Sequence, residues 1–216
     1  MSSGQEPTDL VWYAAYGSNM HADRFGCYLA GGIPAGASMV RPHPGCRDRA
    51  GPRRAVPVLL PGGIYFATES ATWSGGVAFY DPALPGVAAG RAYLVTAGQF
   101  SDVAAQEMRR PPGTDLDLGP VLRTGRHRLG PGRYETLLSA GTLDGRPLLT
   151  FTAPGRSGDL PANAPSATYL RTLGVGLAEA HGWTAERAAA YLCARPGAAG
   201  AWDPPTVAAL IASGGA

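Results

Sequence analysis

The sequence predicts an α+β fold in which short strands form a mixed sheet or a closed β-barrel, with a few helices packed outside. The first observation is a series of short apolar runs separated by Gly and Pro, the pattern of strands joined by tight turns. The second is that these runs follow one another too closely for helical crossovers, which disfavours a doubly wound parallel sheet. The third is a small number of longer segments that start at a capping residue, as helices do.

The first half of the chain begins with a strand and a short helix. Residues 10–16 form a continuous apolar run, which predicts a buried strand. Asn19 is placed to cap a helix over 20–29, and Gly31-Gly32 to end it. Residues 33–55 are irregular and rich in arginine. Four short strands are then expected, over 56–60, 63–68, 76–80 and 90–95.

The second half holds the longer helices. Thr96 is the expected cap of a helix over 97–110, which Pro111-Pro112 terminates. A polar loop over 111–132 leads to a hairpin of strands 133–140 and 146–152, joined by an Asp-Gly turn. Three further helices are expected behind the caps Ser166, Thr184 and Asp203, the first two ending near 181 and 194. We expect a flexible tail over 1–9, a single domain over 10–195, and a C-terminal extension with a short helix over 196–216.

Composition excludes several classes of protein. All 18 basic residues of the 216-residue chain are arginine, which indicates a GC-rich bacterial genome and excludes any Schiff-base lysine or phosphate-binding P-loop lysine. A net charge of +2 argues against nucleic acid as a partner. The polar N-terminus lacks a signal peptide, and no apolar run is long enough for a membrane span. Three widely spaced cysteines favour a reducing cytoplasm.

The turn after the first strand is the first candidate site. Tyr16, Gly17, Ser18 and Asn19 lie between a strand and a helix start, where free backbone N–H groups can bind an anion or a developing oxyanion. An ordinary helix cap is the alternative.

Glu107 is the second candidate. At 100° per residue it falls in the apolar stripe formed by Phe100, Val103 and Ala104, while Gln99, Asp102, Gln106 and Arg109 share the opposite, polar side. A carboxylate on a buried face has a raised pKa, which suits a general acid or base near neutral pH. A structural ion pair or an exposed helix end is the alternative.

Other polar clusters are weaker candidates. Glu69 and Glu135 are expected to be solvated, with a place in the lining of a site as the alternative. The basic residues Arg41, His43, Arg47, Arg49, Arg53 and Arg54 read as a solvated loop, with steering of an acidic substrate or contact with nucleic acid as the alternative. His43 and Cys46 have a spacing seen in metal sites, but the sequence has no dense ligand set, and we expect no metal.

Taken together, these pieces resemble the gamma-glutamylcyclotransferase-like family. Residues 16–20 (Tyr-Gly-Ser-Asn-Met) resemble that family's substrate-binding loop, and residues 90–107 resemble its strand and the helix that carries the catalytic glutamate. The resemblance implies that Glu107 is catalytic. It also implies that Tyr16, Gly17, Ser18, Asn19, Tyr134 and Tyr169 line the substrate site.

The reaction implied by the resemblance is intramolecular aminolysis of a small γ-glutamyl compound, which gives 5-oxoproline and a free amine without a cofactor. An arginine would suit the α-carboxylate, but the sequence does not say which one. Two positions depart from the family pattern, since Ala104 replaces its usual Asp and Met108 its usual Gly. A ligand-binding protein on the same fold and a related amide-processing tailoring enzyme therefore stay open, as do the amine part of the substrate and the oligomeric state.

Overall fold

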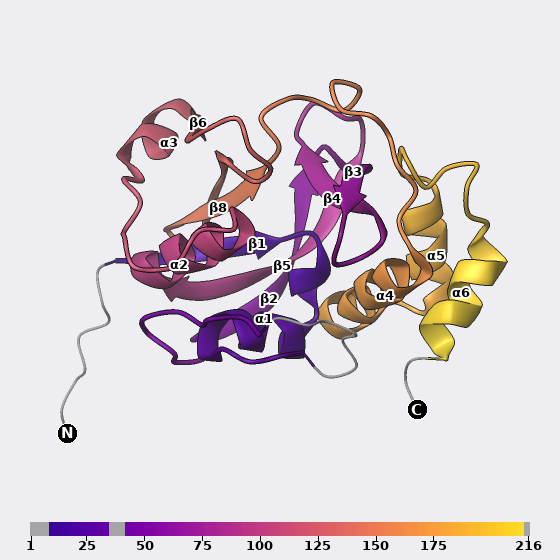
Figure 1. The fold of residues 1–216 in the computed structure, drawn as a ribbon, viewed down its shortest axis with the longest axis horizontal. Coiled ribbons are helices and arrows are strands. Elements are labelled where there is room, and N and C mark those ends of the chain that lie inside the picture. Colours follow the sequence, from indigo (N-terminus) through magenta and orange to yellow (C-terminus); the bar gives the residue numbers. More distant parts are fainter. Residues whose placement is uncertain (1–8, 35–41, 214–216) are drawn as a thin grey trace.

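The computed structural model describes residues 9–34 and 42–213, and Figure 1 shows their arrangement. Residues 1–8 of the expected tail and Arg41 of the basic loop lie outside the described part. The main element is a six-stranded sheet in the order β2-β5-β1-β8-β7-β6, beside a two-stranded sheet of β3 and β4. The strands are β1 (Leu10–Ala15), β2 (Arg54–Pro61), β3 (Gly63–Ser70), β4 (Gly75–Asp81), β5 (Val87–Thr96), β6 (Arg126–Arg128), β7 (Thr136–Leu143) and β8 (Arg146–Thr152).

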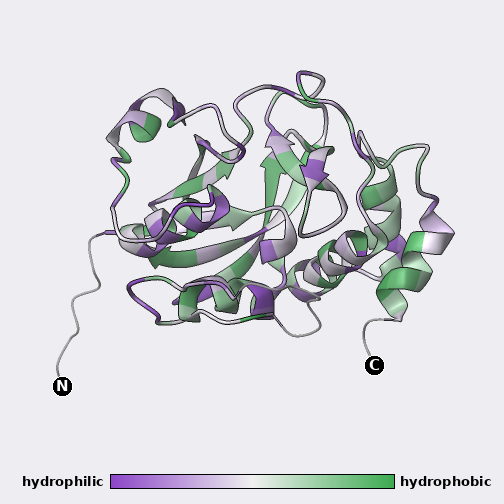
Figure 2. Cartoon of the chain, in the orientation of Figure 1, coloured by the Kyte–Doolittle hydropathy of each residue, from purple (hydrophilic) through white to green (hydrophobic). Residues whose placement is uncertain are grey.

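The sheet is mixed and open, so the barrel alternative is not adopted. Strand β1 lies at its centre, antiparallel to β5 and parallel to β8, and every residue of β1 is buried. A strand covered on both faces reads as a continuous apolar run, which is why this one was predictable. Figure 2 shows the strands of the sheet largely in the hydrophobic colour.

The helices lie around the sheet at different places. Helices α4, α5 and α6 gather at one end of the molecule, and α3 lies near the other (Figure 1). They are η1 (Ser18–Met20, a 3₁₀ turn), α1 (Ala22–Ala30), α2 (Ala97–Glu107), α3 (Gly119–Thr124), α4 (Ala167–His181), α5 (Ala185–Cys193) and α6 (Pro204–Ala212). Among the described residues, none of these is long and apolar enough to cross a membrane.

The predicted caps were confirmed except at the first helix. Thr96 forms a capping box at α2, and Ser166, Thr184 and Asp203 each accept a backbone N–H at their helices. Asn19, by contrast, caps nothing: it lies within η1, and α1 starts after His21 without a side-chain cap.

Several elements differ from the sequence prediction in their bounds, and three of the differences lie between the end of α2 and the start of β7. The expected loop over 111–132 contains α3 and β6, which are too short to show a period. Helix α2 ends at Glu107 because the chain leaves helical geometry at Arg109, where φ is 57°. Strand β7 starts at Thr136, so Tyr134 precedes it, with φ of 62°.

Candidate functional site

A cavity of about 440 Å³ opens where the end of β1, helix α1 and the end of α2 meet. Its wall is completed by β4, the segment before β7 and the start of α4. All seven residues that the sequence singled out line it, namely Tyr16, Gly17, Ser18, Asn19, Glu107, Tyr134 and Tyr169. They come from segments up to 153 positions apart in the sequence, so only the fold brings them together.

The backbone after β1 is held in place by side chains from the neighbouring strand. The Tyr93 hydroxyl donates to the carbonyl oxygens of Asn19 (2.9 Å) and Met20 (3.2 Å). Arg91 Nη1 also donates to the Met20 carbonyl, at 3.3 Å. At the start of α1, the Ala22 N–H donates to Glu179 of α4 at 2.8 Å. Strand and helix thus fix the loop over 16–20 from two sides.

This loop presents unused donors to the cavity. Within the described chain, the backbone N–H groups of Ser18 and Asn19 have no hydrogen-bond acceptor. Gly17 has an extended backbone (φ −109°, ψ −150°), so the turn does not require glycine for its φ angle. A side chain at Gly17 would instead start 3.4 Å from the Tyr169 hydroxyl, inside the cavity. The absent side chain therefore leaves room for a ligand.

Glu107 is the last residue of α2 and is bonded to the same loop. Asn19 Nδ2 donates to Glu107 Oε1 at 3.0 Å. Burial raises the pKa of Glu107 above its usual value, and the hydrogen bond from Tyr28, the charge of Arg24 and the bond from Asn19 offset part of that rise. The carboxylate is thus ready to exchange protons nearer to neutral pH than an exposed glutamate.

The apolar stripe of α2 agrees with its predicted position, but the opposite face does not. Phe100, Val103 and Ala104 are completely buried. Gln99 and Asp102 lie on the side opposite the apolar stripe, as expected, yet they too are buried, and they contact the segment that follows His43.

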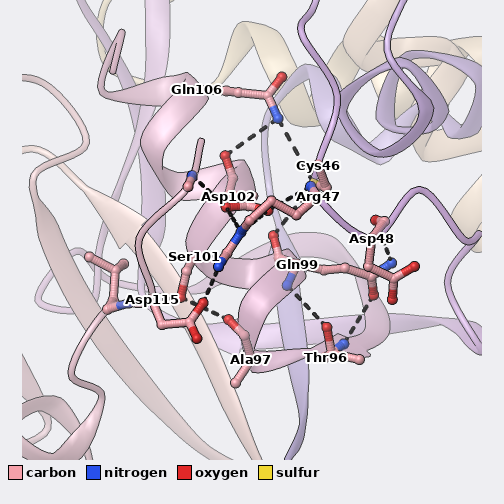
Figure 3. A network of polar contacts seen from close by, with 12 residues as sticks. Cys46, Arg47, Asp48, Thr96, Ala97, Gln99, Ser101, Asp102, Gln106 and Asp115 are labelled. Carbon is pink, nitrogen blue, oxygen red and sulfur yellow. Dashed lines mark hydrogen bonds and ion pairs between the residues drawn. The ribbon is translucent and has the colours of Figure 1, made fainter. Parts of the chain in front are cut away.

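Figure 3 shows how this segment is tied to α2. Asp102 accepts from the Arg47 backbone N–H at 2.8 Å and from its Nε at 3.0 Å, and Arg47 also pairs with Asp115. Gln99 Nε2 donates to the carbonyls of Asp48 (3.2 Å) and Ala50 (2.9 Å). Arg47 is exposed, as expected of a solvated basic loop, and in addition its guanidinium is bound by a buried carboxylate on α2.

His43 and Cys46 do not form a metal site with each other. The His43 ring lies on the Tyr28 ring with centroids 4.0 Å apart, and burial lowers its pKa to about 4. Cys46 Sγ donates to the Tyr28 carbonyl at 3.3 Å. The described residues include no group of three or more His, Cys, Asp or Glu side chains that could hold a metal ion.

The two tyrosines from the second half of the chain meet at one residue of β4. Tyr134 donates its hydroxyl proton to the Ala78 carbonyl at 3.0 Å, and the Ala78 N–H donates to the Tyr169 hydroxyl at 3.1 Å. Burial raises the pKa values of both tyrosines. Both phenols are therefore neutral walls of the cavity.

Glu135 differs from its expected solvated position, whereas Glu69 agrees with it. Glu135 is buried, pairs with Arg110 and accepts from the Gly132 N–H at 2.7 Å. Glu69 is exposed.

Sequence reasoning missed several residues of the cavity wall, among them Tyr13, Arg24, Tyr28 and Trp73. Arg24 carried a detectable signal. It lies with Phe25, Tyr28 and Leu29 on the buried side of α1, so the helical-face test that singled out Glu107 would have singled out Arg24 too.

The chain has an α+β fold that is shared with gamma-glutamyl cyclotransferase. A solved structure described as gamma-glutamyl cyclotransferase matches with a TM-score of 0.51 and 14% identity, over 94% of this chain and 99% of that one. An uncharacterized human protein matches with a TM-score of 0.51 and 16% identity, over 87% of this chain and 89% of that one. At such identities the likeness shows the fold alone.

In sequence, the chain is similar to Histone deacetylase 5 of Arabidopsis thaliana, with 31% identity over 204 residues. The match covers 84% of this chain but 30% of the plant protein, so the chain spans less than a third of that relative's length. No family model matches the chain.

Proposed function

We propose that this protein is a gamma-glutamylcyclotransferase-like enzyme with Glu107 as its general acid and base. It cleaves the side-chain amide of a γ-glutamyl compound by intramolecular aminolysis. The observation that carries the proposal is the 3.0 Å bond between Asn19 and Glu107, because it joins the turn after β1 to a partly buried carboxylate inside one cavity.

The reaction begins when the α-amine of the substrate attacks its own γ-amide carbonyl. Glu107 accepts a proton from the attacking amine, and a C–N bond closes the five-membered ring. The same carboxyl then gives a proton to the leaving nitrogen as the old C–N bond breaks, which releases 5-oxoproline and an amine. Because both reacting groups belong to one molecule, the cavity mainly has to hold the folded conformer.

The other residues of the cavity have supporting roles in this proposal. The free N–H groups of Ser18 and Asn19 stabilise the negative charge that develops on the carbonyl oxygen. Asn19 also fixes the direction of the Glu107 carboxylate. Tyr16, Tyr134 and Tyr169 shape the wall around the ring that forms.

Of the two departures from the family pattern, one reaches the site. Ala104 is completely buried in the core and is not part of the cavity wall, whereas Met108 lines the cavity. Met108 therefore narrows the space beside Glu107 and acts on the choice of substrate.

The amine part of the substrate has a place to extend. A second hollow of about 710 Å³ shares His43, Thr72, Gln106 and Arg109 with the first and is otherwise lined largely by prolines and Arg110. We assign the leaving amine to this second hollow, because the γ-glutamyl head of the substrate occupies the first cavity, beside Glu107.

The Glu107→Gln variant tests the catalytic proposal. It keeps an oxygen that accepts the Asn19 bond but cannot take a proton, so 5-oxoproline release should fall at least about a hundredfold. Glu186→Gln, on the exposed face of α5, is the matched control and should keep full activity. Undiminished turnover by Glu107→Gln in a panel of γ-glutamyl amines and peptides would refute the assignment.

A ligand-binding protein on the same fold is the second candidate, favoured by Met108 in the cavity. Tight binding of a γ-glutamyl compound without any release of 5-oxoproline by the wild-type protein would establish it. Deacetylation, suggested by the name of the plant relative, has weaker support, since no group of three metal ligands is present among the described residues.

A further inference from the structure

We propose that Arg24 binds the α-carboxylate of the substrate and so restricts this site to γ-amides of glutamate that keep a free α-carboxylate. The inference rests on the proposed function, since it concerns the other end of the same substrate head.

Arg24 is a buried cation that faces the cavity. Its residue is 8% exposed, and its side chain is part of the cavity wall. The guanidinium carbon lies 4.8 Å from the centre of the Trp73 ring and 5.8 Å from that of Tyr28. Two aromatic rings thus hold the planar group in one orientation, which favours a two-pronged contact with a carboxylate.

No protein carboxylate neutralises this cation directly. Within the described part of the chain, none of the ion pairs includes Arg24. Its Nε donates to the Ser18 hydroxyl at 2.9 Å, and its side chain also hydrogen-bonds Tyr28. A buried charge without a direct partner is unfavourable, so an anionic ligand gains by supplying one.

Arg24 and Glu107 are placed as a complementary pair. Adjacent residues of one loop hold them, Ser18 for Arg24 and Asn19 for Glu107. Both side chains line the same cavity, and Tyr28 of that cavity interacts with each of them.

An α-amino acid head has the same arrangement with the charges reversed. Its amine and its carboxylate are attached to one carbon, and at neutral pH they form a zwitterion. With the amine at Glu107, the carboxylate falls on the side of Arg24. A 4-aminobutyryl amide has the same amine and the same amide but no carboxylate, so it cannot use Arg24.

Ligand binding tests the role of Arg24 without requiring turnover. We would compare two probes by calorimetry: 5-oxoproline, which carries the carboxylate, and 2-pyrrolidinone, the same ring without it. The wild-type protein should bind 5-oxoproline at least about tenfold more tightly, as expected for a charge-assisted contact. Arg24→Met should remove that preference and leave the weak binding of 2-pyrrolidinone unchanged.

Two further variants keep the result interpretable. Arg24→Gln retains an N–H group for Ser18 but no charge, so it replaces Arg24→Met if that variant does not fold, with the same expected loss. Arg187→Met is the matched control, because the Arg187 guanidinium also lies over a tryptophan ring, at 4.5 Å from Trp183, but lines neither cavity. The control should keep the wild-type preference.

The outcomes separate this inference from the catalytic proposal. Glu107→Gln should still prefer 5-oxoproline, whatever happens to its turnover. An unchanged preference in the Arg24 variants, an equal loss for both probes, or no binding of 5-oxoproline to the wild-type protein at millimolar concentration would overturn the role of Arg24. If Glu107→Gln remained active while Arg24→Met lost the preference, the catalytic proposal alone would fail.

Discussion

The Glu107 carboxyl lies in surroundings that act on its ionisation in opposite directions. Burial opposes its ionisation, while Asn19, Tyr28 and Arg24 support it. The effect of burial is larger than that of these three groups, so the pKa of Glu107 is raised. Its carboxyl therefore binds a proton more tightly than an exposed glutamate does. The bond from Asn19 therefore has two effects, since it both orients the carboxylate and limits the rise of its pKa.

We expect Glu107 to titrate above the usual glutamate value of 4.5. The Asn19→Ala variant removes a donor that favours the ionised form, so the pKa of Glu107 should move further upward. NMR titration of glutamate side-chain carboxyls would measure this, because the chain has only six glutamates and Glu107→Gln identifies the signal.

The control for this titration is Glu186→Gln, which should leave the Glu107 signal unmoved. A Glu107 signal at or below the usual value would contradict the raised pKa. A downward shift in Asn19→Ala would contradict the role given to the hydrogen bond.

At this scale the sequence was informative where a residue stood out in its own helix. Glu107 lies in line with an apolar stripe whose Phe100, Val103 and Ala104 are completely buried, and Glu107 at the end of the helix is itself partly buried, so the local pattern was enough to single it out. The pair of Arg47 and Asp102 could not be predicted, because its members are 55 positions apart and nothing local in either segment points to the other. The role of Asn19 could not be predicted either. An asparagine that caps a helix and one that donates to a distant carboxylate can have the same neighbours in sequence.

At the scale of elements, the position of the loop over 16–20 depends on how closely α4 approaches it. A Cβ atom at Gly176 would lie 2.7 Å from Met20 Cβ and 2.9 Å from the His21 backbone nitrogen. At Gly174, nearly opposite on the same helix, it would lie 2.3 Å from Ile211 Cγ1 of α6. The two glycines thus allow α4 to pack closely against the loop on one side and against α6 on the other.

We expect Gly176→Ala and Gly174→Ala to destabilise the protein by about 1–3 kcal/mol each, because both insert a methyl group into a filled interface. Only Gly176→Ala displaces the loop, so it alone should lower 5-oxoproline affinity, by roughly tenfold. Thermal unfolding and the binding assay together would show this. Equal losses of affinity in both variants would mean that the close approach of α4 does not position the loop.

Elements were predictable in proportion to their length and their end signals. Helices α2, α4 and α5 have a capping side chain immediately before their first residue, and each was predicted on that basis. Helix α3 has only Pro at its start and Gly125 at its end, and six residues show no apolar period. Strand β6, with three residues, is shorter still and depends on pairing with β7.

At the scale of the whole molecule, the C-terminal residues are packed into the rest of the chain. Val207 and Ile211 of α6 are buried, and Trp202 Nε1 donates to the Pro165 carbonyl at 2.8 Å, just before the cap of α4. The Phe66 N–H of β3 donates to the Pro196 carbonyl at 2.8 Å. A domain boundary at residue 195 stays a prediction, and these contacts provide its test.

We expect truncation after Arg195 to lower the free energy of unfolding by about 3 kcal/mol or more, since it uncovers the faces that α6 buries. In the full chain, the Ile211→Ala variant should lower the free energy of unfolding by about 2–5 kcal/mol. Ala209→Ser, at an exposed position of the same helix, is the control. Denaturant unfolding measures all three, and a truncated chain of unchanged stability would support an independent domain over 10–195.

The order of the strands was the least predictable feature of the whole molecule. The apolar runs and turns indicated how many strands to expect and where, but not which strands are neighbours. The parallel pairing of β1 with β8 joins Trp12 to Leu148 and Tyr13 to Leu149 across most of the chain. Such pairing depends on how both faces of the sheet are covered, which no local pattern records.

The central place of β1 has a consequence for how the protein is made. Strand β1 precedes the other described strands and helices in the sequence, yet it pairs with β5, which ends at Thr96, and with β8, which ends at Thr152. Its six apolar residues therefore have neither neighbouring strand until β5 has been made, and only one until β8 has been made, a state that favours aggregation and binding by chaperones. The loop with Ser18 and Asn19 directly follows β1, and the Ala22 N–H just beyond it donates to Glu179, so the loop is fixed from both sides only after α4 has been translated.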